Sequence, residues 1–107
     1  MTITTHVLDT SKGVAASDIP VILLKSSKGG WTEVGKGETN GDGRLSFDCE
    51  SVEATYQLLF NVETYLKKFE DHFYSVIPVV FSVEDVKRKY HVPLLLSPYG
   101  YSTYRGS

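Results

Sequence analysis

Short apolar or β-branched runs, separated by turn residues, follow one another along this chain, and the first of them alternates between two faces. In residues 3–8, Thr4, His6 and Leu8 fall on one face while Thr5 and Val7 fall on the other. A period of two residues predicts a β-strand with one face toward a core. Similar short apolar or β-branched runs follow at residues 19–24, 31–35, 45–47, 56–62 and 76–83, and two more lie in residues 91–107, on either side of Ser97-Pro98.

The turn signals between these runs are strongest at residues 40–43. Their sequence, NGDG, contains both an Asn-Gly and an Asp-Gly pair, which are the dipeptides most typical of tight hairpins. We therefore expect a hairpin here, with Arg44 at the start of the returning strand. Pro78 lies inside the run 76–83. Because proline has no backbone N–H, it predicts an edge strand or a bulge at that position.

One stretch departs from the period of two and predicts a short amphipathic helix over about residues 62–70. Asn61 is suited to cap its start. Four apolar side chains recur at the spacing of one helix face, namely Val62, Tyr65, Leu66 and Phe69. The whole chain then reads as seven or eight strands and one helix. This pattern predicts a mainly β fold, a two-sheet β-sandwich in which residues 1–107 form a single domain.

Charge and composition exclude several classes of partner. The 11 Lys and Arg residues against 13 Asp and Glu residues give a net charge of −2, so nucleic acid is not an expected partner. No apolar run reaches the roughly 18 residues of a membrane span, and no leader segment is evident. We expect a cytoplasmic protein as the sequence stands; a peroxisomal or periplasmic location stays open if a targeting segment was removed. Cys49 is the single cysteine, so no intrachain disulfide is expected.

The candidate chemistry rests on His6, His91 and Arg44. His6 shares a strand face with Thr4, and His91 shares one with Pro93 and Leu95. If these faces meet across a subunit interface, the two imidazoles could face one pocket and move a proton near neutral pH. Arg44 could then stabilise a developing oxyanion. The alternative reading is that both histidines are ordinary strand residues and that Arg44 is a solvated charge beside a turn. His72 has no assigned role.

The chain offers no convincing motif for a metal or a cofactor. Residues 38–43 faintly resemble a calcium loop, but Cys49 stands where a bidentate glutamate is required. A zinc site made from His6 and His91 would be opposed by the positive charge of Arg44. No phosphate-binding glycine loop and no nucleophile elbow is present. We therefore expect a protein that uses neither a metal nor a cofactor.

Three separate blocks of sequence resemble one known family. Residues 5–10 (THVLDT), residues 40–44 (NGDGR) and residues 91–107 (HVPLLLSPYGYSTYRGS) are similar to the histidine motif, the arginine motif and the C-terminal signature of 5-hydroxyisourate hydrolases. These enzymes are the transthyretin-related hydrolases of purine breakdown. The resemblance covers essentially the whole chain, and it implies the transthyretin fold.

The resemblance also implies an activity and a site. The expected reaction is cofactor-free hydrolysis of 5-hydroxyisourate to 2-oxo-4-hydroxy-4-carboxy-5-ureidoimidazoline, in a homotetramer built as a dimer of dimers. The positions that match catalytic residues of the family are His6, Arg44, His91 and Ser107. The expected substrate-binding residues are His6, Arg44, Tyr104 and Arg105. Two rival classes remain open at this point, a transthyretin-like carrier of small ligands without catalysis and a β-sandwich adhesion module.

Overall fold

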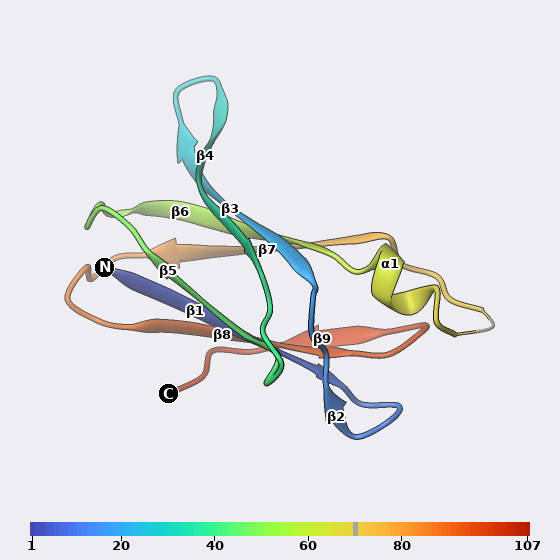
Figure 1. Ribbon diagram of the computed structural model, residues 1–107. Helices are drawn as coiled ribbons and strands as arrows, with labels where there is room; N and C mark the ends of the chain where they lie inside the picture. Colours follow the sequence, from blue (N-terminus) through green and yellow to red (C-terminus); the bar gives the residue numbers. More distant parts are fainter. Residues whose placement is uncertain (70) are drawn as a thin grey trace.

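The strands of this protein form two packed sheets (Figure 1), in a computed structural model that describes residues 1–69 and 71–107. The first sheet has the order β2-β1-β8-β9, and β5 also pairs with β1; the second has the order β4-β3-β6-β7. The strands are β1 (Thr2–Asp9), β2 (Val14–Ala15), β3 (Pro20–Ser27), β4 (Gly30–Glu38), β5 (Arg44–Asp48), β6 (Ala54–Asn61), β7 (Val76–Val83), β8 (Tyr90–Leu96) and β9 (Tyr101–Thr103). The predicted two-sheet sandwich is confirmed, with the two-residue β2 in addition to the strands that the sequence indicated.

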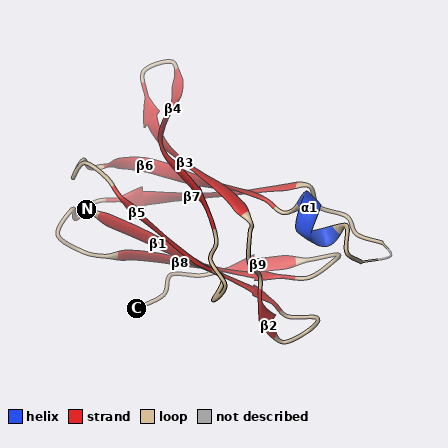
Figure 2. Ribbon diagram, viewed as in Figure 1, coloured by secondary structure: helices blue, strands red, loops and turns tan. Residues whose placement is uncertain are grey.

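The core lies between the sheets and follows the alternation of the strands. In β1, Ile3 and Val7 are fully buried, whereas Thr4 and His6 on the opposite face are only half-buried. From the second sheet, β6 contributes Tyr56, Leu58 and Phe60 to the same core. Figure 2 shows that strands make up almost all of the regular structure. The outer face of the first sheet is therefore the part of β1 that remains available for chemistry.

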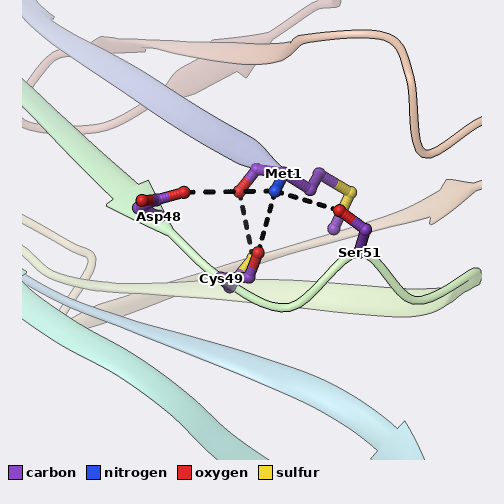
Figure 3. A network of polar contacts seen from close by, with 4 residues as sticks. All are labelled: Met1, Asp48, Cys49 and Ser51. Carbon is purple, nitrogen blue, oxygen red and sulfur yellow. Dashed lines mark hydrogen bonds and ion pairs between the residues drawn. The ribbon is translucent and has the colours of Figure 1, made fainter.

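Strand β1 is the centre of the first sheet. It pairs in parallel with β8 on one side and antiparallel with β5 on the other. Met1 continues the second pairing: its amino group donates to Cys49 O at 2.9 Å, and Cys49 N donates to Met1 O at 3.0 Å (Figure 3). β1 is consequently held along its length by neighbours from the middle and from the end of the chain.

The predicted turn at residues 40–43 forms, but the strands on its two sides, β4 and β5, do not pair with each other as a hairpin requires. β4 pairs with β3 in the second sheet, and β5 pairs with β1 in the first. The turn instead carries the chain from one sheet to the other. Val7 N donates to Gly43 O at 2.7 Å, and a Cβ on Gly43 would lie 3.1 Å from Cβ of Ala15. Gly43 has a φ of +75°, so glycine is needed here both for conformation and for space.

The predicted helix is correct in its buried face and wrong in its length. The helix α1 spans Glu63–Leu66 and lies at the end of the sandwich opposite the N-terminus (Figure 1). Beyond it, Phe69 N donates to Leu66 O in an i→i−3 turn, so the helix does not continue to the predicted end. The predicted part at residue 70 lies outside the described residues. Within the described chain, no helix is long or apolar enough to cross a membrane.

The cap of α1 also differs from the prediction. Val62 occupies the N-cap position, and no side chain caps the helix there. Asn61 lies one residue earlier, and its Oδ1 accepts a hydrogen bond from Glu63 N at 3.3 Å. At the other predicted irregularity, Pro78 is on β7, which is the last strand of its sheet. The edge-strand prediction for this proline is therefore confirmed.

A buried carboxylate ties α1 to the first sheet. Asp9 is 1% exposed, and its Oδ2 accepts a hydrogen bond from Tyr65 Oη at 2.6 Å. Its Oδ1 accepts from Ser11 N and Oγ and from Lys12 N. Burial alone would raise the pKa of Asp9, but these hydrogen bonds outweigh it and lower the pKa below 3.8.

We expect Tyr65→Phe to lower the free energy of unfolding by about 1.5–3 kcal/mol near neutral pH, because it removes a buried hydrogen bond to a charged group. The lowered pKa of Asp9 means that this stabilisation is present above pH 3.8 and is lost as the pH falls through the lower folded value. Urea unfolding of both proteins at neutral pH and at acid pH checks this expectation. Tyr74→Phe is the control, since no hydrogen bond of its hydroxyl is found in the described chain. An equal decrease in the free energy of unfolding for Tyr65→Phe and Tyr74→Phe would contradict the stabilising role of the hydrogen bond to Asp9.

Candidate active site

Three adjacent strands bring the predicted polar residues onto the outer face of the first sheet. Arg44 on β5 is the direct cross-strand partner of His6 on β1. Two residues before His6 on β1, Thr4 is the cross-strand partner of His91 on β8. Partners in register project from the same side of a sheet, so His6, Arg44 and His91 share one surface. The sequence led us to expect that the two histidine faces meet across a subunit interface, whereas the structure brings them onto one sheet of a single chain.

The turn before β5 holds Arg44 in place. Asn40 Oδ1 accepts hydrogen bonds from Asp42 N at 2.9 Å and from Arg44 N at 3.0 Å. Asn40 N in turn donates to Arg44 O at 2.9 Å. This local side-chain to backbone pattern is why asparagine suits the position. Arg44 is exposed on the surface of β5, so its guanidinium can meet a ligand without breaking an ion pair in the described chain.

The same turn determines which ring nitrogen of His6 carries a proton. Its Nε2 lies 2.9 Å from the backbone oxygen of Asp42. A carbonyl oxygen only accepts hydrogen bonds, so Nε2 must carry a proton. In the neutral imidazole, Nδ1 is then the nitrogen with the lone pair. His6 is thus oriented by a backbone contact that the turn sequence creates.

His91 has a different environment. Its Nδ1 lies 2.7 Å from Thr4 Oγ1. Burial, the positive charge of Arg44 and the proximity of His6 lower the pKa of His91 below 6.5. The imidazole is therefore neutral at pH 7 and able to take up a proton. Nε2 of His91 has no hydrogen-bond partner in the described part of the chain.

The C-terminal tail reaches this surface through its backbone. Gly106 N donates to His91 O at 2.8 Å, which forms a single bridge to β8. Beyond it, Ser107 lines a cavity of about 620 Å³ together with Thr4, Arg44 and His91. Glu38 and Lys89 also border this cavity. The predicted catalytic residues Arg44, His91 and Ser107 therefore meet in one place, and His6 adjoins them as the partner of Arg44.

Tyr104 and Arg105 lie elsewhere in the single chain. With His91 they line a separate hollow of about 230 Å³, toward β7. The Arg105 guanidinium stands 4.7 Å over the Tyr90 ring and reaches Lys89 O at 3.5 Å. Their predicted contact with substrate stays a prediction, because the described chain does not bring them into the cavity with Arg44.

Sequence reasoning did not identify Thr4, Asn40 or Gly106 as part of the site. The strand alternation already placed Thr4 on the face of His6, but nothing local indicated that a residue of β8 would lie opposite. Among residues 1–69 and 71–107, no group of three or more His, Cys, Asp or Glu side chains is arranged to hold a metal ion. The side chains that border the cavity carry imidazole, guanidinium and hydroxyl groups, together with the carboxylate of Glu38 and the ammonium group of Lys89.

The fold and this surface together define a transthyretin-like sandwich that carries two histidines and an arginine on its outer face. A sequence profile described as the HIUase/Transthyretin family matches residues 3–106. The chain belongs to this family. Because both a carrier and a hydrolase share the fold, the family alone does not decide between them.

Individual relatives add detail. The 5-hydroxyisourate hydrolase of Halalkalibacterium halodurans is 45% identical over an alignment of 115 positions that covers 98% of this chain and 97% of that protein. The structure of Klebsiella pneumoniae 5-hydroxyisourate hydrolase superposes with a TM-score of 0.82 at 29% identity and covers 100% of both chains. Sea bream transthyretin in complex with thyroxine superposes with a TM-score of 0.87 at 26% identity, over 97% of this chain and 93% of that one.

A larger protein contains the same unit. The crystal structure of (S)-allantoin synthase superposes with a TM-score of 0.86 at 34% identity, over 98% of this chain. This chain spans only 43% of that one. The sandwich therefore also occurs as one part of a longer protein.

We expect Gly106→Ala to disturb His91 without unfolding the sandwich. A Cβ on Gly106 would overlap Cδ2 of His91 and lie 3.1 Å from its Cγ, so the ring or the tail must move. Nitrogen-15 spectra of the imidazole should show a shifted His91 signal and a changed pKa. The control is Gly100→Ala, whose Cβ would meet only Ser97 Oγ at an ordinary 3.6 Å. An unchanged His91 signal in Gly106→Ala would contradict the close approach.

Proposed function

We propose that this protein is a 5-hydroxyisourate hydrolase, which opens its substrate to 2-oxo-4-hydroxy-4-carboxy-5-ureidoimidazoline. The observation that carries the proposal is the joint presence of His6, Arg44 and His91 on one face of the first sheet. Relatives named as 5-hydroxyisourate hydrolases at 45% and 41% identity, each matched over 98% of this chain, support the same activity.

The proposed reaction is the addition of water to a ring carbonyl. One histidine takes a proton from water as the water oxygen bonds to the carbonyl carbon. The carbonyl oxygen becomes an anion, which the Arg44 guanidinium stabilises. The ring C–N bond then breaks, and the departing nitrogen takes the proton back from the imidazolium. One water is consumed, and the histidine returns to its neutral form.

Arg44 is suited to this role by its geometry. A guanidinium presents parallel N–H donors that fit the planar urea and amide edges of such a ring. Ser107 lies at the same cavity and would complete the hydrogen bonds around water or substrate. Because the groups are held by backbone pairing on three strands, they are positioned before substrate arrives, which is where most of the acceleration would arise.

The alternative function is a carrier that binds a small ligand without reacting with it. The likeness to a transthyretin seen with thyroxine favours this reading at the level of the fold. A carrier needs no neutral imidazole beside a cation, whereas the lowered pKa of His91 supplies a base at neutral pH. An ultraviolet assay of fresh 5-hydroxyisourate, with and without protein, separates the two functions.

In that assay, His6→Asn, Arg44→Gln and His91→Asn should each lower kcat/KM by about 100-fold or more, because each removes a proton carrier or the oxyanion partner. His72→Asn is the matched control, since His72 lies in the loop after α1, away from the cavity.

Activity should fall at acid pH with a midpoint below 6.5, since His91 stays neutral to a lower pH than an ordinary histidine. Wild-type rates in the three variants would disprove the assignment.

We also propose assembly into a homotetramer, arranged as a dimer of dimers, with the cavity enclosed between subunits. β7 and β9 end their sheets in the isolated chain, and an unpaired edge tends to recruit another strand. Exposed apolar side chains border these edges, with Val76, Val80, Tyr101 and Tyr104 each at least 40% exposed. Arg44 also lies on an open surface, which a second subunit would close off from water.

Light scattering at micromolar concentration should therefore give the mass of four chains. Val80→Lys places a charge on the edge of β7 and should shift the protein to smaller species with reduced activity. Val14→Lys on β2 is the control, because Val14 is similarly exposed, at 49% against 56%, but lies in the other sheet, at the opposite end of the strand order from β9. A fully active wild-type monomer would contradict the shared site.

A further inference from the structure

We infer that Thr4 is a positioning residue, which holds the His91 imidazole in the tautomer that leaves Nε2 free to accept a proton at the cavity. This inference rests on the proposed hydrolase function and assigns the base to His91 rather than to His6. It starts from the contact between Thr4 Oγ1 and His91 Nδ1 at 2.7 Å.

The backbone makes this contact rigid. Thr4 and His91 are partners in the parallel pairing of β1 and β8, although 87 residues separate them in sequence. A threonine on a strand has a restricted χ1 angle, so its hydroxyl has little freedom to leave the imidazole. No other hydrogen-bond partner of Thr4 Oγ1 is found in the described chain. The hydroxyl is therefore committed to His91.

Two hydrogen-bond arrangements are compatible with this distance. If the hydroxyl donates to Nδ1, the proton of the neutral ring sits on Nε2, and His91 cannot act as a base at the cavity. If Nδ1–H donates to the hydroxyl, Nε2 carries the lone pair. Only the second arrangement also suits the imidazolium that forms during the reaction, because both of its nitrogens are donors. Thr4 then accepts the same hydrogen bond before and after proton transfer.

Gly106 restrains the edge of the His91 ring that carries Cδ2. Gly106 lies so close to Cδ2 of His91 that no side chain fits between them. Rotation of the ring by half a turn would exchange Nδ1 with Cδ2, and so would lose the hydrogen bond to Thr4. Thr4 and Gly106 thus hold the imidazole from two sides.

His6 uses the other ring nitrogen for its hydrogen bond to the protein. Its Nε2–H is committed to the backbone oxygen of Asp42, which leaves Nδ1 as its free nitrogen. The two histidines therefore present different nitrogens to their surroundings, and they have different second partners. A fixed hydroxyl acceptor behind Nδ1 is the feature that distinguishes His91 as the base.

Of the groups near His91 that can carry a charge, Arg44 and His6 both lower its pKa. Arg44 comes from β5, His6 from β1, Lys89 from the segment before β8, and Glu38 from the end of β4. Ser107 approaches from the tail. None of these groups is bonded to Nδ1, so removal of the Thr4 hydroxyl changes the tautomer while the surrounding charge stays the same.

The test compares Thr4→Val, which keeps the shape and removes the hydroxyl, with Thr4→Ser, which restores it. Thr4→Val should lower kcat by about tenfold or more, with the roughly 10²–10⁴-fold contribution of a general base as the upper limit, and should leave KM nearly unchanged. Its acid limb in kcat/KM should also move. Thr4→Ser should recover most of the rate. Thr2→Val, two residues earlier on the same strand face, is the control and should behave as the wild type.

Nitrogen-15 spectroscopy of His91 in the resting protein supplies a readout that does not depend on turnover. The expected result is a protonated Nδ1 and an unprotonated Nε2 near pH 7.5, with a mixture of tautomers in Thr4→Val. A protonated Nε2 in the wild type would overturn the inference, and so would an unchanged kcat and pH profile in folded Thr4→Val. If the wild type does not hydrolyse 5-hydroxyisourate, the proposed function fails, and the spectrum still decides whether Thr4 sets the tautomer.

Discussion

The hydrogen bond from Val7 N to Gly43 O is the contact on which the arrangement of the site depends. It docks the turn at residues 40–43 onto β1, so that the chain leaves the second sheet and enters the first. Gly43 permits this because its φ of +75° and its close neighbours leave no room for a side chain. Arg44 then follows directly as the partner of His6. A single sheet-to-sheet crossing thus creates the cationic part of the cavity.

The sequence predicted the strands well because alternation is a local property of the chain. It identified the turn before Arg44 and the apolar face of the helix for the same reason. It failed where the answer depends on distant residues. The partner of β5 depends on the fit of Gly43 against Val7 and Ala15. The helix ends at Leu66, and an i→i−3 turn follows it.

The candidate site was predictable as a set of residues and not as a geometry. Similarity of three sequence blocks indicated His6, Arg44, His91 and Ser107, but the contact between Thr4 and His91 spans 87 residues and leaves no local pattern. The orientation of Arg105 was hidden in the same way, since its stacking on Tyr90 is visible only in the folded chain. Residue types indicated the candidate residues, and long-range strand pairing sets their geometry.

The parallel pairing of β1 with β8 also sets the order in which the protein can mature. β1 can meet β5 as soon as the first half of the chain is available, but its other edge must wait for a strand that begins at Tyr90. Pairings of such long sequence separation form slowly, since a large loop must close before any contact compensates for the lost entropy. Until then β1 carries an open edge that can pair with another nascent chain. The same strand arrangement that aligns the imidazoles therefore leaves the half-synthesised chain with an unpaired strand edge.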